Sequence, residues 1–117
     1  MIFFNIYGFN ISIESKSSEL LDRLKLEFSF FISNHIEEAH FKVTSNLTND
    51  NSSLMIPSNL KPTFQRQNSI TYDFDNIRWN DYYGKVISKI DFQNHNAILI
   101  GSNFDKLFEI TYLLIIS

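Results

Sequence analysis

Apolar and polar residues alternate at the start of the chain, which predicts β-strands. Every second residue is apolar in residues 2–6 and again in residues 9–13. A period of two residues is typical of a strand with one buried face. Gly8 lies between the two sets and suits a tight turn or a bulge. We expect two short strands or one bent strand within residues 2–14.

A helical period follows this alternation. Apolar residues recur every three or four positions from Ser17 to Ser33, which predicts an amphipathic helix packed on a sheet. Ser17 or Ser18 can cap its start by accepting a backbone hydrogen bond. Because Leu26 and Phe30 lie off the main apolar stripe, we expect a second contact for them.

The middle of the chain predicts a strand, a long loop and then a run of neighbouring strands. Residues 39–47 predict the strand, and the polar stretch 48–68, which holds both prolines, predicts a surface loop. Short alternating segments follow in residues 69–101, separated by turn residues such as Asp75-Asn76. Close spacing with turn signals is typical of antiparallel pairing.

A second helix is predicted at residues 103–116. Ser102 and Asp105 form the Ser-x-x-acid pattern that opens helices. The last part of the helix, residues 112–116, is apolar on nearly all sides, which indicates burial on all sides. We expect either a further domain of the same chain or a second subunit to cover it.

Together these elements predict one α+β domain over residues 1–117. The expected fold is a mainly antiparallel β-sheet of about six to seven strands, with two helices packed on one face. A length of 117 residues is typical of a single domain. The hydrophobic fraction of 44% and the charged fraction of 20% are ordinary for a globular protein.

Composition and charge narrow the classes of function. The absence of cysteine excludes disulfides, thiolate metal sites and cysteine nucleophiles. A net charge of -3 with scattered basic residues argues against nucleic-acid binding. No apolar run reaches the roughly 18 residues of a membrane helix, and the N-terminus lacks the positive region of a signal peptide. We therefore expect a cytoplasmic protein that has no membrane segment.

Motifs for cofactors, metals or catalysis are not found, so we expect no cofactor and no metal, and we name no catalytic residue. The three glycines do not form a phosphate loop. Asp73 and Asp75 resemble an Asp-x-Asp metal motif, but aspartates are common in turns for local reasons. His35 and His40 lack a metal-binding spacing.

The densest polar and aromatic cluster lies in residues 78–83. Its tryptophan, tyrosine and arginine side chains are the usual anchors of binding sites, and they are also common on exposed sheet faces. With apolar residues of the last helix they make the predicted interaction surface. That surface comprises Arg78, Trp79, Tyr82, Tyr83, Tyr112, Leu114 and Ile115.

The meander and last helix, ITYDFDNIRWNDYYGKVISKIDFQNHNAILIGSNFDKLFEITYLLIIS, resemble the region just upstream of the kinase domain in bacterial proteins related to HPr kinase. The opening FNIYGFNISIES, followed by a Leu-Leu pair, is similar to the start of such chains. The resemblance implies that this chain is the N-terminal part of a longer protein with a P-loop domain. Because the P-loop and its acidic partner have no counterpart here, no site residue carries over.

Three hypotheses about function follow. The first is a non-catalytic N-terminal accessory domain of an HPr kinase-like P-loop protein, which positions a substrate or partner and whose gene runs on past Ser117. The second is a self-contained protein-interaction module that forms a homodimer through its C-terminal helix. The third is a small enzyme that uses His40 or His95 beside Asp73 or Asp81.

Overall fold

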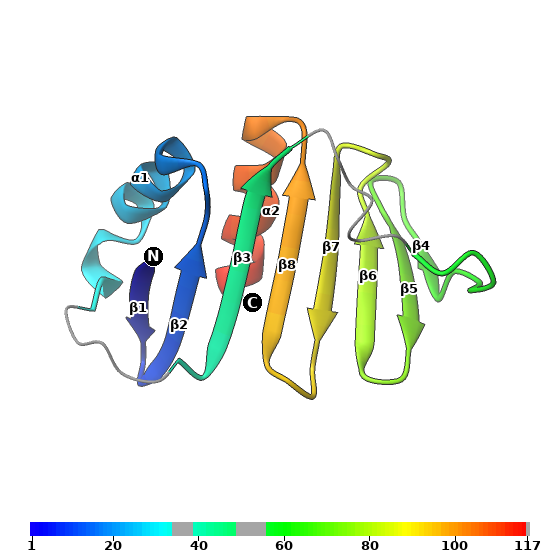
Figure 1. The fold of residues 1–117 in the computed structure, drawn as a ribbon, viewed down its shortest axis with the longest axis horizontal. Coiled ribbons are helices and arrows are strands. Elements are labelled where there is room, and N and C mark those ends of the chain that lie inside the picture. Colours follow the sequence, from blue (N-terminus) through cyan, green and yellow to red (C-terminus); the bar gives the residue numbers. More distant parts are fainter. Residues whose placement is uncertain (34–38, 49–55, 117) are drawn as a thin grey trace.

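The computed structural model describes residues 1–33, 39–48 and 56–116, and within them the expected α+β class is confirmed. One sheet of eight strands carries two α-helices on one face (Figure 1). The elements are β1 Ile2–Ile6, β2 Phe9–Glu14, α1 Ser18–Glu27, the short 3₁₀ helix η1 Ser29–Phe31, β3 Phe41–Leu47, β4 Phe64–Gln65, β5 Ile70–Phe74, β6 Ile77–Asp81, β7 Val86–Asp91, β8 Asn96–Gly101 and α2 Phe104–Ile116. The strand beyond the expected six to seven is β4, two residues long, in the stretch predicted as loop.

The strand order is β1-β2-β3-β8-β7-β6-β5-β4. The pairs β2–β3 and β3–β8 are parallel, and the other five pairs are antiparallel. Parallel neighbours need a long crossover, and α1 lies in the connection from β2 to β3. Strand β3 therefore joins the N-terminal hairpin to the C-terminal meander.

Of the tight turn and the bulge considered for Gly8, the structure shows the tight turn. Tyr7 and Gly8 both have positive φ angles, 53° and 86°, between the paired residues Ile6 and Phe9. A two-residue loop with two positive φ angles has the twist that matches the strands of a hairpin. The alternating residues of β1 and β2 consequently turn the same way, and their apolar set faces the helices.

Helix α1 is shorter than the sequence predicts. The helical period suggested residues 17–33, but the helix ends at Glu27 and the chain then turns toward the edge of β1. There Ile32 forms a bridge with Phe4, and the Ser33 N–H donates to the Phe3 carbonyl at 2.8 Å. These residues protect the edge strand instead of extending the helix.

The off-stripe residues of this segment, Leu26 and Phe30, are exposed, so the described residues do not supply the second contact expected for them.

The hydrophobic core lies between the two helices and the first half of the sheet. From α1, Leu20 and Leu24 are buried, and the Phe28 ring packs on Phe4 with 5.4 Å between centroids. Two polar side chains, Ser45 and Thr111, are also fully buried there.

The helices cover only part of the sheet. Helix α1 lies at the β1–β2 end of the sheet, and α2 packs against β3, β8 and β7 (Figure 1). On the same face, none of the described helices covers β4, β5 or β6 (Figure 1). This uncovered part borders the candidate site.

Candidate binding groove

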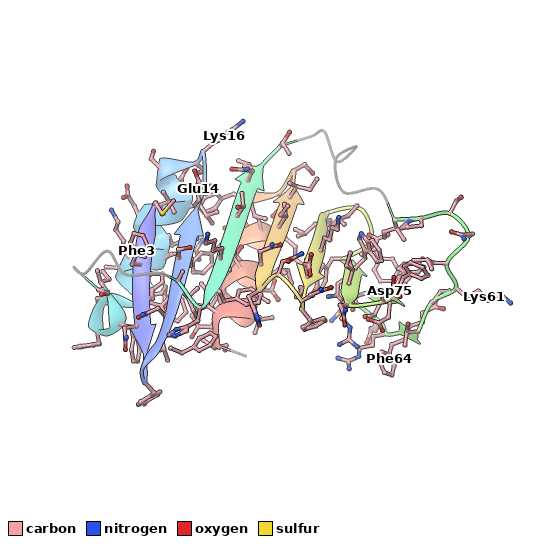
Figure 2. All side chains as sticks on the ribbon, turned by 60° about the horizontal axis from the view of Figure 1, so that its bottom comes forward. Phe3, Glu14, Lys16, Lys61, Phe64 and Asp75 are labelled. Carbon is pink, nitrogen blue, oxygen red and sulfur yellow. The ribbon has the colours of Figure 1, made fainter. Side chains whose placement is uncertain are left out.

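A groove of about 980 Å³ runs along α2 and over the neighbouring part of the sheet that the helices leave uncovered. It extends below the C-terminal end of α2 to the ends of β1, β2 and β3. Its lining comprises Ile6, Phe9, Ile11, Phe41, Val43, Phe64, Arg66, Gln67, Asn68, Ser69, Thr71, Arg78, Asn80, Tyr82, Ile90, Phe92, Lys106, Glu109, Ile110, Leu113, Leu114, Ile115 and Ile116. Figure 2 shows one of them, Phe64, at the end of the sheet far from α1.

One wall of the groove is apolar and comes from α2. Ile110, Leu113 and Ile116 follow one another at steps of three, which places them along one side of the helix. Leu113 and Ile116 are 47% and 55% exposed. An exposed apolar row beside a groove is typical of a surface that binds another molecule.

The floor over β5 and β6 is polar and ordered by its own hydrogen bonds. Arg78 lies opposite Asp73 across the two strands, and its Nε donates to Asp73 Oδ1 at 2.7 Å. Next along the strands, the Thr71 hydroxyl donates to Asn80 Oδ1 at 2.7 Å, and Asn80 Nδ2 donates to Ser88 Oγ at 3.3 Å. This floor can be covered without leaving these groups unpaired.

The ion pair in the floor stays charged at neutral pH. The hydrogen bond from Arg78 lowers the pKa of Asp73, although partial burial opposes the shift. The same bond raises the pKa of Arg78. The floor therefore carries one fixed charge of each sign.

Two polar groups at the end of the groove near β4 are open to a ligand. Arg66 makes no ion pair with a residue that the structure describes, and the Tyr82 hydroxyl makes no hydrogen bond to one. Burial raises the pKa of Tyr82, and nearby Arg66 partly opposes this while Glu109 adds to it. The hydroxyl is therefore protonated at neutral pH and can donate a hydrogen bond. Lys106, by contrast, already has an ion-pair partner, because its Nζ lies 3.3 Å from Glu109 Oε2.

The structure brings four of the seven predicted interaction residues to this groove. They are Arg78, Tyr82, Leu114 and Ile115, although Ile115 is only 6% exposed and belongs mainly to the core. Tyr112 packs instead on the rings of Phe28 and Phe108, with centroids 5.1 and 6.1 Å away.

The remaining two predicted residues lie elsewhere. Trp79 alternates with Arg78 along β6, so it points to the opposite face of the sheet, where it is 5% exposed. Tyr83 has a positive φ in the turn after β6 and donates its hydroxyl proton to the Arg66 carbonyl at 2.7 Å. It thereby helps to fix the position of the β4–β5 hairpin.

The side chains named for the enzyme hypothesis are dispersed. His40 Nδ1 accepts from the Asn10 N–H at 2.9 Å, and Asp81 accepts from the Gly84 N–H in a turn. His95 is exposed in the turn between β7 and β8, and Asp73 is held by its arginine partner.

A metal site is not seen in the described ranges, because no three histidine or acidic side chains gather there. His35 lies outside these ranges.

Sequence reasoning missed Arg66 and Leu113. Arg66 falls in the stretch that was predicted to be a loop. The sequence feature that could have indicated a strand there is the alternation of Phe64 and Arg66 just before the turn at Gln67-Asn68. Leu113 was not identified because the whole C-terminal part of α2 is apolar. The period of apolar residues there does not show which side of the helix faces outward.

Among the described residues, no helix is both long and apolar enough to cross a membrane.

Comparison with known proteins does not identify a relative of this chain. No protein-family model, no curated protein and no solved structure matches this chain. The resemblance to HPr kinase-related proteins therefore stays a prediction from sequence pattern, and the groove is the feature from which function is argued.

Proposed function

We propose that this chain is a non-catalytic accessory domain that positions a substrate or partner, and that it acts in the bacterial cytoplasm as part of an HPr kinase-like P-loop protein. The observation that carries the proposal is the groove between α2 and the uncovered strands. The sequence resemblance supplies the larger protein in which the domain would work.

The groove has the properties of a binding surface. Its volume of about 980 Å³ is at the upper end of the ~300–1,000 Å³ typical of ligand sites. Covering Leu113 and Ile116 would remove apolar surface from water, which is favourable. The polar floor would lose little, because Asp73, Arg78 and Asn80 already have partners within the fold.

A non-catalytic role is supported by how the charged groups are used. Arg78 is bound to Asp73, and Lys106 is bound to Glu109. These groups shape the groove.

A second candidate function is self-association through α2, because Leu113 and Ile116 are exposed on that helix. A second copy would then occupy the groove, and the accessory role would not be needed to explain it.

Sedimentation equilibrium separates the two candidates. We expect the wild-type chain to be a monomer over a wide concentration range, and the Leu113→Glu variant to be a folded monomer as well. Leu26→Glu is the matched control, because it places the same charge at an exposed leucine on α1, away from the groove. A dimer that Leu113→Glu abolishes and Leu26→Glu leaves intact would replace the first candidate by the second.

The coding sequence after Ser117 then tests the accessory role itself. We expect it to continue into a Gly-x-x-x-x-Gly-Lys loop, and the protein it encodes, expressed separately, to bind this domain. A stop codon directly after Ser117, or a P-loop domain that does not bind, would overturn the proposal.

A further inference from the structure

We propose that the groove holds an amphipathic α-helix of a partner protein, with its apolar side against α2 and an acidic side over β5 and β6. This inference rests on the proposed function, because it names the kind of surface that the accessory domain receives. It follows from the spacing of the helices, from the two unlike sides of the groove, and from its unpaired polar groups.

The spacing of the layers leaves room for one further helix. Packed helices lie about 8–10 Å apart, and neighbouring strands about 4.8 Å apart, so each helix covers about two strands. Helix α1 packs beside α2 at the β1–β2 end of the sheet, and α2 lies over β3 and β8 and reaches β7 (Figure 1). The next position at this spacing is over β6 and β5, which border the groove.

The two sides of the groove require a ligand with two unlike faces. The side formed by α2 presents the exposed Leu113 and Ile116, beside the buried Ile110. The floor presents the ion pair of Arg78 and the hydroxyl and amide of Thr71 and Asn80. An amphipathic helix meets both conditions, since its apolar residues recur at i, i+3, i+4 and i+7 and leave the other faces polar.

The length of the groove sets the length of the partner helix. Lys106 and Ile116 both line it, and ten residues of helix span about 15 Å. A helix laid alongside would contact α2 over about three turns. An extended peptide would instead pair with the edge of β4, which is only two residues long and follows Pro62.

Charge selects an acidic partner. Arg66 has no ion-pair partner, and Tyr82 has a free hydroxyl, as far as the structure describes the chain. A carboxylate between them would receive a charge-assisted hydrogen bond from each. A basic helix would instead meet Arg66, Arg78 and Lys106, of which only the last two are neutralised within the fold.

Selection from a phage-displayed library of random 16-residue peptides tests this inference without knowledge of the natural partner. The wild-type chain is the bait, and the Leu113→Glu variant removes peptides that bind elsewhere. We expect enriched peptides to carry apolar residues at helical spacing and acidic residues on one adjoining face.

Synthetic peptides from the selection are then measured by fluorescence anisotropy against matched variants. We expect Arg66→Glu and Leu113→Glu each to weaken binding about tenfold or more. Lys61→Glu makes the same change of charge as Arg66→Glu, and Leu26→Glu the same substitution as Leu113→Glu, both outside the groove. Each should stay within about twofold of wild type. Figure 2 shows Lys61 pointing away from the molecule on the segment before β4, which makes it a suitable control.

Three results of the peptide experiments would overturn the inference. They are a library without peptides specific to the wild-type groove, peptides that lack acidic residues, and peptides that bind Arg66→Glu as well as wild type. A groove that takes up oleate in calorimetry but selects no peptide is a small-molecule site, which also overturns it. If the P-loop protein binds while any of these results is found, this inference fails and the proposed function stands.

Discussion

Two hydroxyl groups inside the core form a short chain of hydrogen bonds with a definite direction. The Thr111 hydroxyl donates to the Leu107 carbonyl at 2.7 Å and lies 2.9 Å from Ser45 Oγ. Because Thr111 has only one hydroxyl proton, Ser45 must be the donor in the second bond. The bond joins β3 to α2 at a point where neither side chain is exposed.

The first prediction at the residue scale concerns this pair. Thr111→Val should lower the free energy of unfolding by about 1–3 kcal/mol, because it leaves the Ser45 hydroxyl buried without an acceptor. Ser45→Ala should cost less, since Thr111 keeps its bond to Leu107. Urea unfolding of both variants and of the double variant measures the coupling. The double variant should lose less than the two single losses together, and strictly additive losses would contradict the bond.

A second residue-scale prediction concerns pH. The pKa of Asp73 is lowered in the folded state by Arg78, whereas an aspartate in the unfolded chain titrates near about 3.9. The pair therefore adds stability above the unfolded pKa, and this contribution is lost as the pH falls through the lowered, folded pKa. Asp73→Asn should be less stable than wild type at pH 7, and the difference should shrink at pH 3 and below. Urea unfolding at each pH checks this.

The control for this experiment is Asp22→Asn, which removes a negative charge from an exposed position on α1. A stability difference for Asp73→Asn that is the same at pH 7 and at the lowest pH would show that the ion pair does not contribute through its charge.

At the scale of elements, the start of α2 differs from its sequence pattern. The pattern pointed to Ser102 as the cap, but Asn103 accepts the Lys106 N–H at 2.9 Å through its side chain. We expect Asn103→Ala to lower the free energy of unfolding by about 1 kcal/mol, and Ser102→Ala to change it by no more than about 0.5 kcal/mol. Thermal or urea unfolding of the two variants measures their losses of stability. A larger loss for Ser102→Ala than for Asn103→Ala would identify Ser102 as the cap.

The end of α1 shows why some element boundaries cannot be predicted from the neighbouring sequence. The apolar period continues past Phe28, so residues 29–33 looked helical. In the folded chain Ile32 bridges to Phe4. That contact joins residues far apart in the sequence, and a pattern read along a short window does not contain it.

For the whole molecule, the sequence was sufficient for the fold class and for most of the strands. Alternation in residues 2–6 and 9–13 predicted strand structure there, as two short strands or one bent strand, and the structure shows the two-strand form. The turn at Asp75-Asn76 predicted the pairing of β5 with β6, which is confirmed. These features depend on neighbours in the chain. The parallel pairs on either side of β3 join segments that are distant in the sequence, and the residue pattern of a single segment does not predict them.

The candidate groove was predictable only in part. Arg78, Tyr82 and Leu114 were singled out for their residue types, and they line the groove. Arg66 comes beside Tyr82 only because the β4–β5 hairpin turns back toward β6. Leu113 is distinguished from its apolar neighbours only by where α1 and the sheet happen to lie. Both depend on tertiary packing.

The position of β3 also has a kinetic consequence. Lys42 pairs with Asn96, so nearly half of the chain lies between the two partners at the centre of the sheet. Closing so long a loop costs entropy before the contacts form, and pairings distant in sequence slow folding. The hairpins β1–β2 and β5–β6 can form within their own short segments. We therefore expect the two halves of the sheet to take shape early and their junction at β3 and β8 to set the overall folding rate.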